Sequence, residues 1–226
     1  MKRPLLLCAL LAGTAFAAKE RATFRYTAPP EGERPVIVNA VIGPQGSDFA
    51  MRLRFDKVPF GDACKNRCAN TTLLLDTDNS KQTGLRLAAK KAPGNGADVA
   101  VVIQGVRDYA SQEGAPAASW LRVKVRLLGS EASSVDDGEL LAEFNHRQDP
   151  ERLHVDGETI YLLVDATSAA LPSARKARVV YQPPGAKPLQ ATIPGMIGGG
   201  SGKGVRIFKD GSWGKARALF RELKVA

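Results

Sequence analysis

Short apolar segments bounded by glycine and proline recur along this 226-residue chain, and they constrain its fold more than any other feature. In residues 49–56 and 120–127 every second residue is apolar, which predicts strands with one face toward a core and the other toward solvent. About ten such segments at regular spacing, with few helical runs, predict an all-β fold. We expect an antiparallel β-sandwich of jelly-roll-like form.

The connections between these segments are predicted from their boundaries. Residues 98–106 are apolar almost throughout, so we expect a central strand there. A further strand is expected to leave through Thr83 and Gly84, after the apolar segment that begins at Leu73. The Asp-Gly dipeptide at 156–157 predicts a hairpin that joins residues 140–146 to residues 159–164. The other expected strands are residues 23–27, 35–42, 177–181 and 189–193.

The N-terminus has the three parts of a secretory signal peptide. A basic start is followed by an apolar run over residues 5–12 and by Ala15-Phe16-Ala17, the small-x-small pattern of a cleavage site. The apolar run is shorter than the roughly 20 residues that a bilayer requires, so we expect no membrane span. We therefore predict a signal peptide over residues 1–17 and a secreted or periplasmic protein.

The mature chain is predicted to be one β-sandwich domain over residues 18–194 with a short appendage. Residues 195–204 are glycine-rich but lack the spacing of a phosphate-binding loop, which favours a flexible linker. Residues 205–226 form a basic C-terminal tail, in which residues 215–223 are compatible with a short helix.

Cys64 and Cys68 are the two cysteines that remain after removal of the signal peptide. In an oxidising compartment a close pair in a loop favours a structural disulfide. A redox pair and free thiols are the alternatives, and a metal site lacks further Cys or His nearby.

The chain carries a net charge of +9, and the predicted signal peptide accounts for two of these charges. Many of the basic residues alternate with apolar ones, which predicts solvent faces of strands. Such basic faces attract acidic glycans, anionic headgroups or nucleic acid, and export argues against nucleic acid. The two basic faces are formed by Arg52 with Arg54, and by Arg122 with Lys124 and Arg126.

Asp76, Asp78 and Asp98 are the residues that most clearly suggest a site. The first two end one apolar strand and the third begins another, so we expect their carboxylates at the same edge of the sheet. Carboxylates so close together repel one another unless a cation neutralises them, and Ca²⁺ prefers such oxygen ligands. Lys81 and Leu87 stand where an EF-hand needs Gly and Glu, so that motif is excluded. The alternative is a polar turn whose side chains cap backbone N–H groups.

Residues 73–84 read Leu-Leu-Leu-Asp-Thr-Asp-Asn-Ser-Lys-Gln-Thr-Gly, and Gly-Ala-Asp follows at 96–98. This pattern resembles the strand–turn–strand of family 9 carbohydrate-binding modules and related DOMON-like β-sandwiches. Residues 156–162 are similar to later strands of those proteins, so the resemblance covers about residues 36–193. It implies a jelly-roll-like sandwich with a structural Ca²⁺ near Asp76, Asp78 and Asp98.

The resemblance does not carry over a sugar site or a haem site. Sugar-binding members stack the ring between aromatic side chains, whereas Trp120 and Trp213 are far apart here and aromatic residues make up 6% of the chain. Trp120 begins an alternating segment, and we expect it in the core. Some related sandwiches hold haem through Met, His or Lys, for which Met51, His146 and His154 are the candidates.

The sequence gives little support for catalysis. It contains no Gly-x-Ser-x-Gly elbow and no His-Glu-x-x-His pair, so we do not expect an enzyme. The function we expect is an exported, non-catalytic β-sandwich with a structural calcium site that binds a glycan or a cell-envelope component. The alternative is a subunit or adaptor of an envelope protein assembly, docked through a basic sheet face or the C-terminal tail.

Overall fold

The computed structural model describes residues 22–27, 34–45, 48–61, 67–89, 91–108, 118–165 and 176–194. Within these ranges the chain is built from strands, and its one helical element is the 3-10 turn η3 (Val135–Asp137). The strands are β1 (Ala22–Arg25), β2 (Ile37–Gln45), β3 (Asp48–Phe55), β4 (Asn70–Asp76), β5 (Val99–Asp108), β6 (Ala118–Leu127), β7 (Glu139–Asn145), β8 (Leu153–Asp156), β9 (Thr159–Asp165), β10 (Lys176–Tyr181) and β11 (Leu189–Pro194).

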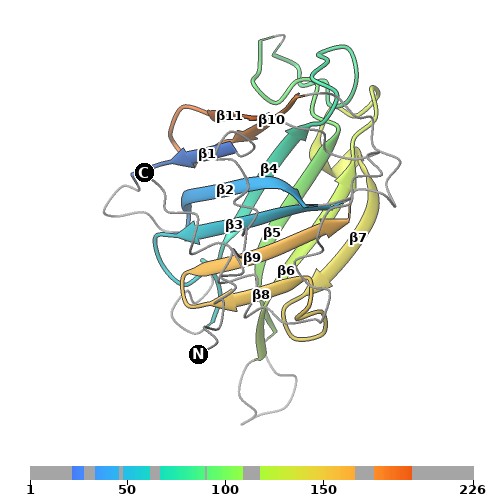
Figure 1. The fold of residues 1–226 in the computed structure, drawn as a ribbon. Coiled ribbons are helices and arrows are strands. Elements are labelled where there is room, and N and C mark those ends of the chain that lie inside the picture. The colour runs from blue at the N-terminus through green and yellow to red at the C-terminus, as the bar shows by residue number, and fades with distance from the viewer. Residues whose placement is uncertain are drawn as a thin grey trace, which may run out of the picture.

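The strands form two antiparallel sheets packed face to face, which confirms the predicted β-sandwich (Figure 1). One sheet has five strands in the order β1-β2-β3-β9-β8, and the other has six in the order β11-β10-β4-β5-β6-β7. Two pairings, β3 with β9 and β4 with β10, join segments far apart in the sequence. Strand β5 lies between β4 and β6 inside its sheet, as its apolar sequence predicts.

The core lies between the two sheets and contains the inward side chains of both. Phe55, Leu73, Ile103 and Leu121 are among the fully buried ones, and they come from different strands. Burying one such side chain is worth about 1.5–3 kcal/mol, so the alternation seen in the sequence is sufficient to fix which face of each strand turns inward.

A second apolar cluster covers part of the outer face of the six-stranded sheet. Its buried members are Leu85, Ala97, Ala100, Leu128 and Ala132. They bring the loops after β4 and after β6 down onto the sheet, where partly buried Leu74 and Val102 pack against them. The end of the sheet that carries the aspartates is therefore covered by its own loops.

The predicted strand through Thr83 and Gly84 is wrong, because residues 77–89 and 91–98 contain no strand. Gly84 has a φ of 65°, outside the range of a strand. The apolar residues that follow, Leu85 and Leu87, pack onto the outside of the sheet instead of pairing with a strand. The loop is closed by backbone hydrogen bonds from Leu85 N to the Ala97 carbonyl at 2.7 Å and from Gly96 N to the Leu85 carbonyl at 2.9 Å.

The predicted hairpin is correct at its turn and wrong in the strands it joins. Asp156 and Gly157 connect β8 to β9, whereas β7 lies in the other sheet. Gly157 has a φ of 60°, the left-handed conformation that this turn requires. Residues 146–152 instead carry the chain from one sheet to the other. No local sequence pattern indicates such a change of sheet.

The expectation that Trp120 lies in the core is also wrong. Leu121, Val123 and Val125 point inward and are buried, so Trp120 shares the outer face with Arg122 and remains partly exposed. Side chains two residues apart in a strand point to the same face, so Trp120 lies on the outer face with Arg122.

The predicted signal peptide (1–17), the linker (195–204) and the tail (205–226) lie outside the described residues. No helix in the part of the chain that is described has the length and apolar character needed to cross a membrane. Cys68 is buried and engaged in a disulfide. Its expected partner, Cys64, lies outside the described residues, so the Cys64–Cys68 pairing stays a prediction.

Candidate metal centre

Asp76, Asp78 and Asp98 are brought together at one end of the six-stranded sheet, as the sequence predicts. Asp76 is the last residue of β4. Asp98 immediately precedes β5, which pairs with β4. The Asp98 N–H donates to the Leu75 carbonyl at 2.8 Å, so the start of β5 is fixed beside the end of β4. One carboxylate oxygen from each aspartate lies within 4.8 Å of the other two.

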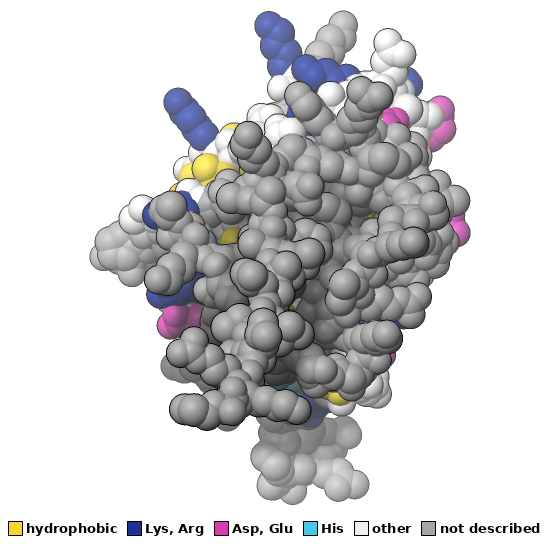
Figure 2. Space-filling model, viewed as in Figure 1, with side chains coloured by type: hydrophobic (Ala, Val, Ile, Leu, Met, Phe, Trp, Pro, Cys, Tyr) yellow, Lys and Arg dark blue, Asp and Glu magenta, His cyan; other side chains and the backbone are white. Residues whose placement is uncertain are grey.

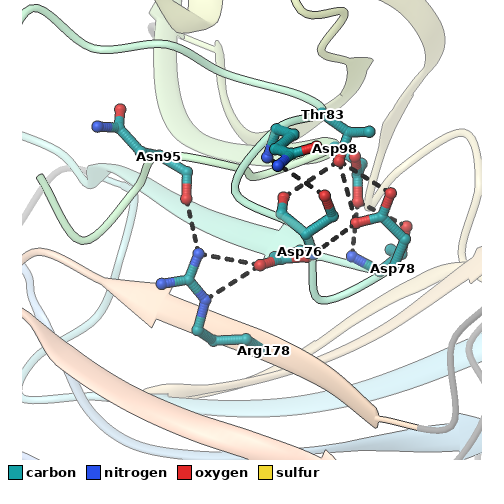
Figure 3. A network of polar contacts seen from close by, with 9 residues as sticks. Asp76, Asp78, Thr83, Asn95, Asp98 and Arg178 are labelled. Atoms are coloured by element: carbon teal, nitrogen blue, oxygen red, sulfur yellow. Dashed lines mark hydrogen bonds and ion pairs between the residues drawn. The ribbon is translucent and has the colours of Figure 1, made fainter. Parts of the chain in front are cut away.

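Arg178 supplies the cation nearest to this cluster. It is the cross-strand partner of Asp76 on β10, and its Nη2 and Nε donate to Asp76 Oδ2 at 2.9 and 3.2 Å. The same Nη2 donates to the Asn95 carbonyl at 2.7 Å, which ties the loop after β4 to β10. In Figure 3, Asp76 lies between Arg178 on one side and Asp78 and Asp98 on the other.

Each of the other two carboxylates is held by donors from its own loop. Asp98 Oδ2 accepts from the Thr77 N–H at 2.7 Å and from the Thr77 hydroxyl at 2.9 Å. Asp78 accepts from the Ser80 N–H at 2.8 Å and from the Thr83 hydroxyl, whose shorter bond is 2.8 Å. Donors of this kind fix the orientation of carboxylates in metal sites.

The loop backbone reaches this geometry through glycines that cannot be replaced without moving it. A Cβ on Gly84 would lie 2.2 Å from the Ala97 carbonyl oxygen, and one on Gly96 would lie 2.5 Å from the Ser80 carbonyl oxygen. Both glycines have positive φ, as does Asn79 at 55°. Asn79 is a residue type that tolerates the left-handed region, so the turn between Asp78 and Ser80 is encoded locally.

Burial dominates the electrostatics of the cluster. Asp76 and Asp98 are 2% and 3% exposed. Burial raises the pKa of Asp76 above its ordinary value, although Arg178 acts in the opposite direction, and the charges of Asp98 and Asp78 add to the rise. Burial also raises the pKa of Asp98, against the hydrogen bonds from Thr77. Two of the three carboxylates are thus costly to ionise in the folded chain without a further cation.

The surface around this end carries both basic and acidic side chains. Lys and Arg side chains project at the upper end of the view in Figure 2, where the loop after β4 emerges in Figure 1. The exposed basic residues of the loop are Lys81, Arg86 and Lys91. Asp76 and Asp98 are therefore buried beneath a surface of mixed charge.

The cluster has the chemistry of a hard-cation site. Its three carboxylates and one guanidinium carry a net charge of about −2 when ionised, and carboxylate oxygens are ligands that divalent cations take. Ser80 donates its N–H to both Asp78 and Asp76, the latter at 3.2 Å. Asn79 is exposed.

Sequence reasoning missed the residues that hold the carboxylates in place. Thr77 and Thr83 lie inside the recognised motif, and their roles as donors are of a kind that short polar turns often show. No local sequence pattern indicates the role of Arg178, because that role depends on the pairing of β10 with β4.

The other residues singled out in the sequence lie outside this cluster. Met51 is fully buried between the sheets. The His146 ring lies 4.6 Å from that of Phe60, centre to centre, and its Nδ1 accepts a hydrogen bond from the Leu121 N–H at 3.0 Å. His146 Nδ1 is thereby occupied within the fold, and burial lowers the pKa of His146. The ring of His154 lies 6.1 Å from that of Tyr161.

Comparison of the chain with models of protein families, with curated proteins and with solved structures finds no match. The resemblance to family 9 carbohydrate-binding modules therefore stays a prediction from the motif at residues 73–98. What is known of the site is the geometry of its own residues, namely three converging carboxylates and one arginine.

Proposed function

We propose that this protein is an exported, non-catalytic β-sandwich that holds a structural Ca²⁺ at Asp76, Asp78 and Asp98 and binds a glycan or another cell-envelope component. The observation that supports calcium is the burial of carboxylates whose oxygens lie within 4.8 Å of one another beside a single arginine. A divalent cation matches the charge that the arginine leaves uncompensated. Export is supported by residues 1–17, and the glycan by the basic sheet faces, which attract acidic glycans.

The role proposed for the ion is to clamp one end of the sandwich. It would join the end of β4, the start of β5 and the turn between them, next to the contact that Arg178 makes from β10. A structural role fits the burial of Asp76 and Asp98, which leaves their carboxylates little surface for a substrate. It also fits the donors that hold the carboxylates in fixed orientations.

The calcium proposal is tested by thermal unfolding of the full chain with and without a chelator. We expect about one Ca²⁺ per chain in the purified protein. Chelation should lower Tm by roughly 5–10 °C, because a ligand at 100 times its Kd stabilises a protein by about 2.7 kcal/mol. Added Ca²⁺ should restore Tm, and Mg²⁺ at the same concentration should not, because Mg²⁺ demands a tighter octahedral set of ligands.

Asp98→Asn and Asp136→Asn form a matched pair of variants. Asp98 is in the cluster, whereas Asp136 is an exposed acid of the turn η3. Asp98→Asn should lose the response to calcium, and Asp136→Asn should keep it. An unchanged Tm in chelator, together with a metal-free purified protein, would show instead that the aspartates only cap the turn.

The adaptor function is the second candidate, and it would use a basic sheet face or the C-terminal tail for docking. The tail lies outside the described residues. The basic faces are partly engaged within the sheets, where Arg54 lies 3.9 Å from Glu158 and Lys124 lies 3.5 Å from Glu143. A pull-down that is lost on deleting residues 205–226 would favour the adaptor, and binding to a glycan array after the same deletion would favour the glycan.

A further inference from the structure

The outer face of the six-stranded sheet carries a strip of planar polar side chains beside a tryptophan. The strip runs over β4–β7 and consists of Asn70, Gln104, Trp120, Arg122, Lys124 and Glu143. Asn70 opens β4 and Asp76 ends it, so the row of Asn70, Gln104 and Arg122 lies about 20 Å along the strand from Asp76. The loops that cover the other end of this face pack mainly around Leu74 and Ala100.

Hydrogen bonds between strands hold the strip in one arrangement. Arg122 Nη2 donates to Gln104 Oε1 at 2.9 Å, and Gln104 Nε2 donates to Asn70 Oδ1 at 3.4 Å. The three residues face one another in the strand register, so β4, β5 and β6 each contribute one polar group to a single row. A preformed row of donors and acceptors loses little conformational entropy when a ligand binds.

The strip has an excess of positive charge. Arg122 Nη1 and Lys124 Nζ share one carboxylate, that of Glu143, at 3.6 and 3.5 Å. These distances exceed the roughly 2.7–2.9 Å of a charge-assisted hydrogen bond, so both cations are loosely paired. Arg126, two residues further along β6, donates to the neutral carbonyls of Gly138 and Asp136. The face therefore offers more cation than its own carboxylate neutralises.

Trp120 supplies an apolar surface next to these charges. It is partly exposed, two residues from Arg122 and opposite Val106 on β5. The aromatic residue opposite Arg52 on the five-stranded sheet, Tyr161, is only 7% exposed. A partly exposed aromatic residue beside planar amides and a guanidinium thus distinguishes the strip from the basic face around Arg52.

We propose that this strip binds an acidic polysaccharide, a chain of sugar rings that bear carboxylates. Trp120 packs against the apolar face of one ring, the amides of Gln104 and Asn70 bond to ring hydroxyls, and Arg122 with Lys124 takes the carboxylates. The strip suits an extended polymer better than a membrane, because its side chains are polar or charged apart from Trp120, whereas membrane-binding surfaces bury an apolar face in the bilayer. The inference rests on the glycan part of the proposed function and names its ligand class and surface.

The test uses polygalacturonate and its methyl ester, in which a methyl group removes the charge of each carboxylate. We expect the full chain to bind polygalacturonate and to bind the ester at least tenfold more weakly, with an affinity that falls as salt is raised. Trp120→Ala, Arg122→Gln and Lys124→Gln should each weaken binding of polygalacturonate at least fivefold. Arg54→Gln, on the other sheet, is the matched control and should bind like the unmodified protein.

Circular dichroism and urea unfolding show whether each variant folds. Lys124→Gln removes only a partly exposed group, so we expect this variant to fold. It therefore tests the proposal even if Trp120→Ala unfolds. Equal binding of acid and ester would overturn the proposal. Equal losses in Arg54→Gln, or equally tight binding to phosphatidylglycerol vesicles or to single-stranded DNA, would also overturn it.

The outcome is separable from that of the calcium proposal. Binding that persists in Asp98→Asn supports the strip even if the calcium response is lost. Failure to bind any acidic polysaccharide refutes the proposed ligand of the strip and does not affect the calcium proposal. Binding to polygalacturonate that is unaffected by all three strip variants refutes the surface alone and keeps the glycan function.

Discussion

Arg178 and Asp76 are 102 residues apart in the chain and face one another across β10 and β4, joined by hydrogen bonds of 2.9 and 3.2 Å to a single carboxylate oxygen. Asp76 is 2% exposed and the arginine side chain 16%. The pair therefore lies at the boundary between the sheet and the loop that covers it. Because Arg178 also bonds to the Asn95 carbonyl, it connects the aspartate cluster with the far side of that loop.

Arg178→Gln should destabilise the metal-free protein by about 3 kcal/mol, because it leaves a buried carboxylate without its cation. The loss should be smaller in calcium, since the ion would take over part of the neutralisation. The measurement is urea unfolding in chelator and in Ca²⁺. Arg54→Gln is the control, because its exposed partner Glu158 lies 3.9 Å away, and it should cost less than about 0.5 kcal/mol. Equal losses in the two variants would contradict the importance of the buried pair.

The pH dependence of calcium binding follows from the raised pKa values of Asp76 and Asp98. Their ordinary value is 3.8, and burial raises both in the folded protein. The folded chain therefore binds protons more tightly than the unfolded chain, so these two groups destabilise the metal-free protein at neutral pH. That destabilisation is relieved as the pH falls through the raised pKa values. Calcium binding needs the deprotonated carboxylates and should weaken over the same interval.

Isothermal titration at neutral pH and at successively lower pH measures this change, and we expect the affinity for Ca²⁺ to fall as the pH falls. In chelator, the urea stability of Asp98→Asn relative to the parent chain should be greatest at neutral pH and should shrink as the pH falls. The amide oxygen that this substitution introduces can still accept from the Thr77 N–H. A calcium affinity that does not change with pH would argue against carboxylate ligands.

Gly84→Ala should be far more damaging than Gly157→Ala, although both glycines have a positive φ, of 65° and 60°. A Cβ at Gly157 meets nothing within 4 Å, so that change should cost only the conformational penalty of about 1–2 kcal/mol. At Gly84 the new Cβ would collide with the Ala97 carbonyl oxygen at 2.2 Å. We expect a loss above about 3 kcal/mol there.

Urea unfolding gives the two free energies, and calcium titration of Gly84→Ala adds a second result. The loop that Gly84 shapes carries Asp98 at its end, so the variant should also bind calcium more weakly. Similar losses for both glycines would show that the close approach of residues 84 and 97 is not important for stability.

The sequence predicted much of the sandwich because the alternation of apolar residues acts locally. In β6 it correctly assigns Leu121, Val123 and Val125 to one face, since side chains of a strand point to opposite sides in turn. The error at Trp120 came from weighing its apolar character above that period. The wrong prediction of a strand at Thr83 has a different cause. A short apolar run does not indicate whether it will pair with a neighbouring strand or pack onto the outside of a sheet.

The sequence by itself determined most of the strands, the turn at Asp156 and Gly157, and the presence of Asp76, Asp78 and Asp98 near one sheet edge, since each depends mainly on neighbours a few residues away. Only the tertiary structure decided which cation faces them, which loop covers them and which side of β6 is open to solvent. The pairings of β10 with β4 and of β3 with β9 join distant segments. They arise from the packing of two whole sheets, so no short stretch of sequence records them.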